Sequence, residues 1–157
     1  MSIKVRRVVT GTDAQGKAAF VSDGPAPLVQ SNAQGVHVVD LWRSYQVPDN
    51  LGADGGAASG YQPLPPSEGL VVRIAELPPD GPIPPGVKPE EWGMHDSETI
   101  DFVVILSGEI CHRLVSGAEV TLKAGDTLVQ RATRHAWRNR SGKPCVMAVV
   151  KVAGRRG

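Results

Sequence analysis

Four polar residues at alternate positions are of types that could form a chemical site. They are His95, Ser97, Thr99 and Asp101, and the apolar segment 102–106 follows them directly. Residues two apart in a β-strand share a face, so we expect these four side chains to point the same way. An aspartate that enters so apolar a segment is costly to bury unless it is paired. A metal ion, a histidine or an arginine could be its partner.

A second polar cluster lies further along the chain, after the turn predicted at Gly125-Asp126. It consists of His135, Trp137 and Asn139, again at alternate positions. Two neighbouring antiparallel hairpins can bring such faces together inside a barrel. We therefore expect His95, Asp101 and His135 to gather around one point.

Further residues are expected to line a pocket beside this point. His112 alternates with apolar residues on either side, so it is predicted to face the interior. Trp92 and Trp137 lie near the two clusters in sequence, and they favour a pocket for an apolar or aromatic ligand. The residues expected to line the pocket are Ser97, Thr99, His112, Trp92, Trp137, Asn139 and Arg73.

The same residues also fit a site without chemistry. His95 and His135 could be interior histidines whose hydrogen bonds are satisfied, and Asp101 could pair with an arginine such as Arg73 or Arg134. Either tryptophan, taken alone, could be ordinary core packing. The residues by themselves leave these alternatives open.

The elements that must position these residues are predicted to be strands. The expected strands are 3–10, 18–24, 36–42, 69–77, 99–106, 109–115, 119–122, 127–130, 135–139 and 145–152. No segment of ten or more residues has a convincing helical pattern. The 18 glycines and 13 prolines suit short strands joined by turns. The fold class is therefore predicted to be all-β, an antiparallel sandwich or barrel, with a long flexible loop at 48–67.

Composition excludes several classes of partner. The chain has 157 residues, enough for one domain, and its net charge is +1. A near-neutral charge gives no reason to expect nucleic acid as a partner. No segment approaches the roughly 18 apolar residues of a membrane helix, and no apolar signal region opens the chain. We expect a cytoplasmic protein without a membrane partner.

The two polar clusters resemble the motifs of the cupin superfamily, G(x5)HxH(x3,4)E(x6)G followed by G(x5)PxG(x2)H(x3)N. In the first motif, His95 stands at the first histidine, Ser97 at the second histidine and Asp101 at the glutamate, with six residues between Asp101 and Gly108. Ser97 and Asp101 depart from the usual residue types.

The second motif is one residue short. Gly125 matches its opening glycine, and His135 with Asn139 keeps the H(x3)N spacing, while Gln130 and Ala132 stand at the proline and second glycine. The resemblance covers roughly residues 69–152. It implies an antiparallel jelly-roll β-barrel at 69–157. Residues 1–68 would then be N-terminal strands and a flexible loop that pack on the barrel or on a dimer partner, within one structural domain.

The resemblance implies a small-molecule enzyme with a divalent metal ion, namely iron, manganese or zinc, held by His95, Asp101 and His135. The reaction would be of the oxygenase, decarboxylase/lyase or isomerase type. A metal-free alternative uses His95 or His135, oriented by Asp101, as a general base. A third alternative is a barrel that binds a metabolite without chemistry. Pairing of the N-terminal strands across a homodimer is also implied.

Overall fold

The computed structural model describes residues 3–26, 29–49 and 61–155, and these residues form eleven β-strands. The strands are β1 (Arg6–Thr12), β2 (Ala18–Pro25), β3 (Val29–Ser31), β4 (His37–Ser44), β5 (Leu70–Leu77), β6 (Thr99–Ser107), β7 (Glu109–Leu114), β8 (Glu119–Lys123), β9 (Thr127–Arg131), β10 (His135–Arg138) and β11 (Cys145–Ala153). Every pair of neighbouring strands is antiparallel. The described residues contain no helix that could cross a membrane. The prediction of an all-β antiparallel fold is confirmed.

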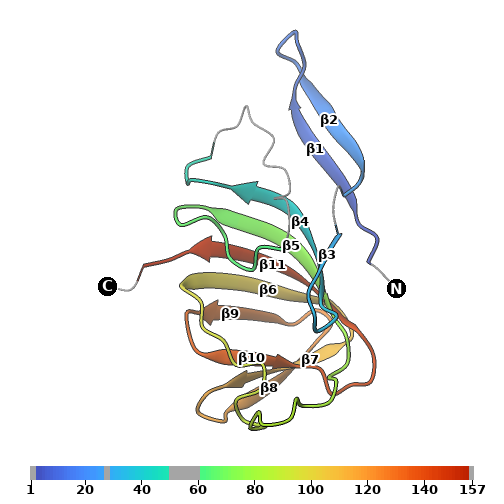
Figure 1. The fold of residues 1–157 in the computed structure, drawn as a ribbon. Helices are drawn as coiled ribbons and strands as arrows, with labels where there is room; N and C mark the ends of the chain where they lie inside the picture. The colour runs from blue at the N-terminus through green and yellow to red at the C-terminus, as the bar shows by residue number, and fades with distance from the viewer. Residues whose placement is uncertain (1–2, 27–28, 50–60, 156–157) are drawn as a thin grey trace.

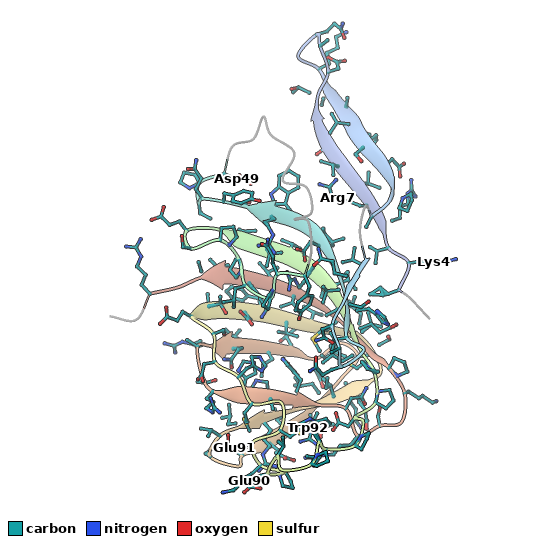
Figure 2. The ribbon with its side chains drawn as sticks, viewed as in Figure 1. Lys4, Arg7, Asp49, Glu90, Glu91 and Trp92 are labelled. Carbon is teal, nitrogen blue, oxygen red and sulfur yellow. The ribbon has the colours of Figure 1, made fainter. Side chains whose placement is uncertain are left out.

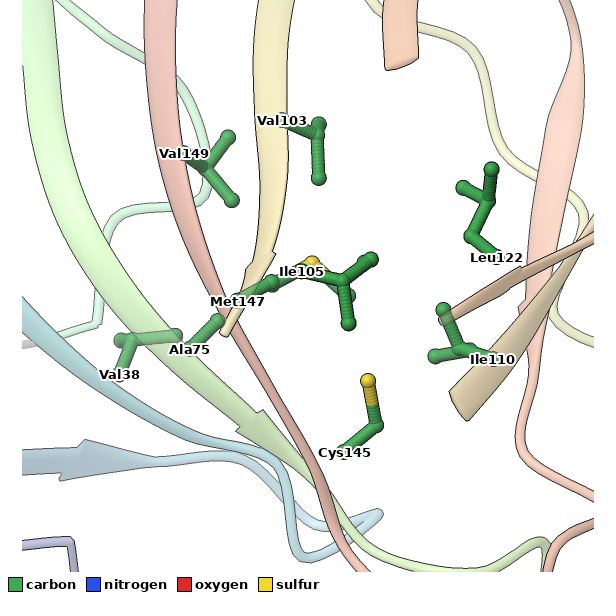
Figure 3. Close-up of a cluster of buried hydrophobic side chains, with 9 residues drawn as sticks. All are labelled: Val38, Ala75, Val103, Ile105, Ile110, Leu122, Cys145, Met147 and Val149. Atoms are coloured by element: carbon green, nitrogen blue, oxygen red, sulfur yellow. The ribbon is translucent and has the colours of Figure 1, made fainter. Parts of the chain in front are cut away.

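The strands form three sheets (Figure 1). The largest has the order β3-β4-β5-β11-β6-β9, the second has the order β10-β7-β8, and β1 pairs with β2 alone. The apolar core takes Val38, Ala75 and Met147 from the six-stranded sheet and Ile110 and Leu122 from the three-stranded sheet. The two larger sheets therefore enclose the core between them, as the close-up in Figure 3 shows. This is the predicted jelly roll, in an open, sandwich-like form.

Strand β6 has a two-residue alternation of burial that sets up the site. Thr99, Asp101, Val103 and Ile105 are buried, while Phe102, Val104 and Leu106 are exposed. The buried face is polar at the start of the strand and apolar at its end. The apolar end belongs to the core cluster, so the polar end lies beyond the core at one end of the barrel.

The turn after β6 depends on a glycine. Gly108 has a φ of +75°, which side-chain-bearing residues rarely adopt. A Cβ atom at this position would lie 2.6 Å from the carbonyl oxygen of Pro144. The predicted Ser107-Gly108 turn is thus required both by backbone conformation and by the close approach of the β10–β11 connection.

The N-terminal part of the chain divides into two pieces. Hairpin β1–β2 projects away from the two larger sheets, and its base is held where Arg7 donates to the Leu41 carbonyl oxygen at 2.6 Å (Figures 1 and 2). Strand β4, in contrast, pairs along β5 in the six-stranded sheet. Residues 37–44 are therefore part of the barrel sheet and not an extension packed on it. Residues 50–60 of the predicted 48–67 loop lie outside the described residues.

Candidate functional site

The buried aspartate of β6 is paired with a lysine. Lys151 on β11 is the cross-strand neighbour of Asp101, and its Nζ lies 3.3 Å from Asp101 Oδ2. The other carboxylate oxygen, Oδ1, is buried and has no hydrogen-bond partner among the described residues. The arginines considered as partners pair elsewhere, Arg73 with Asp40 and Arg134 with surface carboxylates.

Sequence reasoning missed Lys151, although a signal was present. It follows Cys145, Met147 and Val149 at alternate positions of β11, and all three of these residues are buried. The alternation that predicts an inward face for them predicts the same for Lys151. An inward lysine in a central strand requires a partner, because a buried ammonium group without one is strongly unfavourable.

His95 and His135 are brought together by the backbone. Each donates its N–H to the carbonyl oxygen of the other, at 2.9 Å and 3.1 Å. Their ring centroids are 4.3 Å apart. His135 is 1% exposed, whereas His95 is exposed. The pair therefore places one imidazole in the barrel interior and one at its opening.

His112 completes a cluster of three imidazoles. Its ring stacks on His135 with centroids 5.0 Å apart, and Trp137 meets it edge-on at 4.7 Å. His112 is 4% exposed, and its Nε2 has no hydrogen-bond partner among the described residues. Two of the residues predicted to line the pocket, His112 and Trp137, thus lie beside His135.

Hydrogen bonds to carbonyl oxygens indicate the tautomers of two histidines. His135 Nδ1 lies 2.7 Å from the carbonyl oxygen of Thr133, and His95 Nδ1 lies 3.0 Å from that of Gly93. A carbonyl oxygen only accepts, so Nδ1 carries the hydrogen in both rings. In the neutral form, Nε2 of each ring is then left with its lone pair.

Burial keeps the inner histidines neutral. Burial has the largest effect on the pKa of His135 and lowers it. The hydrogen bond to Thr133 and the charge of Asp101 raise this pKa, whereas His95 and Lys151 lower it further. Burial lowers the pKa of His112 to about 4, with additional contributions from His135 and His95. His112 is therefore uncharged at neutral pH.

The loop that orients His135 is held by Gln130. This residue is the cross-strand neighbour of Asp101 and is 3% exposed. Its Nε2 donates to the Thr133 carbonyl oxygen at 2.9 Å, and its Oε1 accepts from the Thr133 hydroxyl at 2.7 Å. Thr133, whose carbonyl oxygen fixes the tautomer of His135, is thus itself held by two hydrogen bonds with Gln130, one of them to that carbonyl oxygen.

Ser97 and Thr99 lie on the face predicted for them. Both are buried, and the Thr99 hydroxyl lies 3.0 Å from the Ser97 hydroxyl oxygen, to which it donates. Ser97 and Thr99 are buried at positions that alternate in step with Asp101. Hydroxyls at these positions can donate to or accept from a bound molecule.

Two residues expected in the pocket, Arg73 and Trp92, do not contact the histidines. Arg73 is buried against Asp40, with Nη2 2.9 Å from the carboxylate. The guanidinium of Arg138 stacks on Trp92, with Arg138 Cζ 4.0 Å from the centroid of the Trp92 ring. Arg138 and His135 are three residues apart in one strand and so point to opposite faces. The structure therefore does not bring Trp92 to the histidines.

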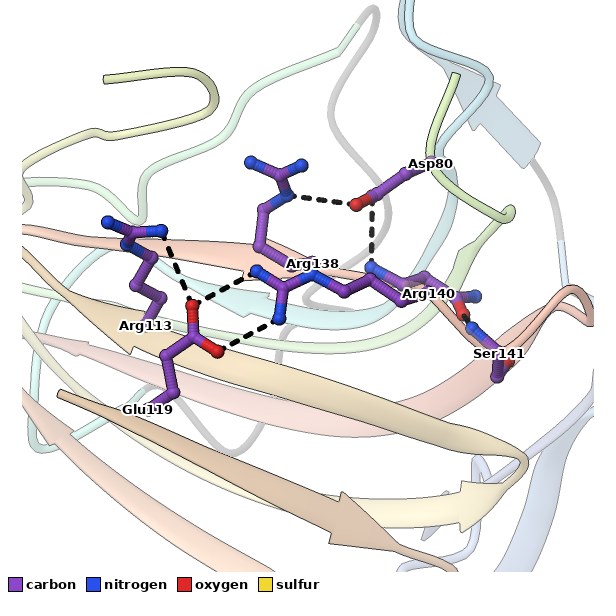
Figure 4. A network of polar contacts seen from close by, with 7 residues as sticks. Asp80, Arg113, Glu119, Arg138, Arg140 and Ser141 are labelled. Atoms are coloured by element: carbon purple, nitrogen blue, oxygen red, sulfur yellow. Dashed lines mark hydrogen bonds and ion pairs between the residues drawn. The ribbon is translucent and has the colours of Figure 1, made fainter. Parts of the chain in front are cut away.

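Asn139 supports the connection after β10. Its amide donates to the carbonyl oxygens of Leu77 and Lys143, and its oxygen accepts from Ser141. Asp80 accepts from Arg138 and from the backbone of Asn139 in the same region (Figure 4). Asn139 therefore orders the connections that follow β5 and β10, and its hydrogen bonds are made there.

The residues as placed do not form a metal centre. No group of three or more His, Cys, Asp or Glu side chains within 3–26, 29–49 and 61–155 is arranged to hold a metal ion. Lys151 gives one physical reason, since an ammonium 3.3 Å from Asp101 repels a cation at that carboxylate. The ligand set of His95, Asp101 and His135 stays a prediction.

Two surface depressions differ in their relation to the histidines. One, of about 410 Å³, includes Thr133, the hydrogen-bond partner of His135. It is lined by Asp96, Leu114, Val115, Ser116, Ala132, Thr133 and Arg134. The other, of about 510 Å³, is lined by residues 46–48, 67–69 and 152–155 and contains none of the candidate residues. The smaller depression is the better candidate for an entrance, because Thr133 contacts His135 directly.

Comparison with known proteins agrees with this architecture. Residues 81–151 match the family described as "Cupin domain". "Phomopsin biosynthesis cluster protein C'" of Diaporthe leptostromiformis is 34% identical over 142 residues, which are 86% of this chain and 70% of that protein. The "cupin-domain-containing oxidoreductase fogC" of Aspergillus ruber is 30% identical over 144 residues, 88% of this chain and 66% of the relative.

Solved structures share the fold at low sequence identity. A putative ethanolamine utilization protein Q from Salmonella typhimurium has a TM-score of 0.52 at 10% identity, covering 98% of this chain and 100% of its own. An RmlC-like cupin from Shewanella frigidimarina has a TM-score of 0.51 at 10% identity, covering 82% and 86%. The chain belongs to the cupin superfamily, as its two motifs predict.

Proposed function

We propose that this protein is a small-molecule enzyme in which His135 accepts a proton from a substrate bound inside the barrel. One observation carries the proposal: the Nδ1 hydrogen bond of His135 to Thr133 leaves Nε2 with an unprotonated lone pair, on a residue that is 1% exposed. Relatives named as cupin-domain-containing oxidoreductases and biosynthesis cluster proteins support a small-molecule enzyme.

The surrounding residues suit a general base. Nε2 of His135 takes a proton from a C–H or O–H group, the bonding electron pair stays on the substrate, and the ring becomes an imidazolium. Asp101 stabilises that imidazolium, because its negative charge raises the pKa of His135. Gln130 and Thr133 hold the ring orientation through the transfer. A positioned base of this kind contributes about 10²- to 10⁴-fold to a rate.

Phenylpyruvate in D₂O tests the proposal, because it carries an acidic CH₂ group beside a carbonyl, an aromatic ring and a carboxylate. We expect the protein to accelerate loss of the CH₂ proton signal, and His135→Gln to remove about 10²-fold or more of that acceleration. The matched control is His37→Gln, which changes a histidine on β4 that hydrogen-bonds to Ser31 on β3. Binding without exchange would instead favour a non-catalytic binding protein, and equal exchange by wild type and His135→Gln would contradict the assigned role.

A divalent metal ion, iron, manganese or zinc, is the second candidate. One observation favours it: His112 Nε2 is a buried imidazole nitrogen without a hydrogen-bond partner among the described residues, on a ring that stacks on His135. Elemental analysis of protein made without a polyhistidine tag tests it. About one metal ion per chain, lost in His95→Ala and His135→Ala, would support this candidate, and an absence of metal in protein from supplemented medium would remove it.

We also propose a homodimer that uses hairpin β1–β2. No third strand joins the hairpin in the part of the chain that the structure describes, and an isolated pair of strands is marginally stable in water. It also exposes apolar side chains, with Val8 45%, Phe20 75% and Val21 55% accessible. Packing against a second copy would cover these side chains and stabilise the hairpin.

A further inference from the structure

A row of side chains, polar except for Val71, crosses the inner face of the six-stranded sheet. Strand register aligns Arg43 with Val71, Val71 with Lys151, Lys151 with Asp101, and Asp101 with Gln130. Lys151 stands at the middle of this row, on the strand that follows β5 and precedes β6 in the sheet order. An ammonium group therefore lies on a central strand of the sheet, at the polar end of its inner face and next to Asp101.

Lys151 is only loosely engaged by Asp101. The 3.3 Å separation exceeds the 2.7–2.9 Å that is usual for a charge-assisted hydrogen bond. An ammonium group has three hydrogens to donate, and no other ion pair of Lys151 is formed among the described residues. Its side chain is 17% exposed, so most of it is shielded from water. The group can therefore donate to a molecule that enters the barrel.

The charges on this inner face do not balance. Asp40 pairs with both Arg43 and Arg73, and all three are at most 3% exposed. With Lys151 and Asp101, the described residues of the face carry three cations against two carboxylates. His112 and His135 cannot offset the excess of positive charge, because a histidine side chain is either neutral or positive. The two arginines also donate to the carbonyl oxygens of Leu64 and Gln62. The positive charge is therefore least compensated at Lys151, where an organic anion would offset it.

We propose that the barrel binds a small organic carboxylate, with one carboxylate oxygen accepting from Lys151 Nζ and the apolar part lying against Trp137 and His112. The two rings meet edge-on at 4.7 Å and offer an apolar wall with an aromatic edge. This inference rests on the proposed function in that both place a ligand in the barrel interior beside His135. It adds the class of ligand and a second contact residue, Lys151.

Binding to Lys151 would also place a substrate for proton transfer. The charge of Lys151 acts on the pKa of His135, as does that of Asp101, so the ammonium and the imidazole share one electrostatic environment. A carboxylate anchored on Lys151 presents its neighbouring carbon atoms toward the base. The ammonium also stabilises negative charge that develops on the substrate when the proton leaves.

Benzoate and benzamide separate the charge from the shape of the ligand. We expect benzoate to shift the imidazole C–H proton signals of His112 and His135 saturably, and benzamide to bind at least tenfold more weakly. Lys151→Met should weaken benzoate binding at least tenfold, and Lys151→Arg should restore part of it. Lys123→Met, at an exposed position of β8, is the matched control and should bind as wild type does.

A folding defect is separated from a binding defect by a second variant. Lys151→Met combined with Asp101→Asn removes both charges together and leaves no unpaired carboxylate in the wall. It should fold and still bind benzoate at least tenfold more weakly than wild type. Equal affinity for benzoate and benzamide, wild-type affinity in the double variant, or no saturable shift in the wild type would each overturn the inference.

The two proposals fail in different ways. Benzoate has no acidic C–H group from which His135 could take a proton. Its binding therefore measures only the contact between the carboxylate and Lys151. If benzoate binds through Lys151 and phenylpyruvate shows no exchange, the proposed function fails and the carboxylate site stands. If proton exchange of phenylpyruvate depends on His135 but benzoate binding does not depend on Lys151, the proposed carboxylate site is wrong and the proposed function stands.

Discussion

Lys151 on β11 and Asp101 on β6 face one another as cross-strand neighbours, with the ammonium 3.3 Å from one carboxylate oxygen. The carboxylate side chain is 6% exposed and the lysine side chain 17%. This ion pair sits where a metal-binding cupin motif would place its carboxylate ligand, and it ties the candidate site to the stability of the barrel.

Asp101→Ala should destabilise the protein by roughly 2–3 kcal/mol, because it leaves Lys151 without its carboxylate in a mostly buried position. Urea unfolding measures this change. The double variant Asp101→Ala, Lys151→Met should recover much of the loss. Glu68→Ala, which breaks an exposed pair with Arg155, should cost less than about 1 kcal/mol. A loss in Asp101→Ala no larger than in Glu68→Ala would show that the pair contributes little.

Acid should destabilise the fold through His112. The pKa of His112 is about 4 in the folded protein and 6.5 as its ordinary value, so the unfolded chain binds its proton first as pH falls. This contribution is intact above pH 6.5, is lost as pH falls toward 4, and amounts to roughly 3 kcal/mol. Unfolding free energies between pH 8 and 4 should fall less steeply in His112→Gln. Parallel curves for wild type and variant would contradict the buried, neutral His112.

The proposed homodimer through hairpin β1–β2 can be tested by measuring the molecular mass in solution. Light scattering at micromolar concentration should give twice the chain mass for the wild type. Phe20→Asp with Val21→Asp should give a monomer, because charges replace exposed apolar side chains at the proposed interface. Val129→Asp, a 54% exposed position on β9, is the matched control. A monomeric wild type, or a double variant that remains dimeric, would remove the hairpin from the interface.

The sequence predicted the fold and one face of the site well, for physical reasons. The alternation from His95 to Asp101 is a local property of a strand, and it correctly placed Ser97, Thr99 and Asp101 on one buried face. Glycine turns such as the one at Gly108 mark the ends of strands. Motif spacing then identified the superfamily that the comparisons establish.

Other features depend on pairings between distant strands. Lys151 faces Asp101 only because β11 lies between β5 and β6, and no local pattern specifies that order. The Thr133 carbonyl that fixes His135 is a backbone group, which residue types do not reveal. Trp92 precedes His95 closely in sequence, yet it stacks under Arg138.

The most direct measurement is the nitrogen-15 NMR spectrum of the His135 ring at pH 7. The structure predicts a neutral imidazole with the proton on Nδ1 and a lone pair on Nε2, and this form should persist to a pH below the ordinary histidine value of 6.5. His135→Gln assigns the signals by their disappearance. A proton on Nε2, or a ring that is already protonated at pH 7, would contradict the role of His135 as the proton acceptor.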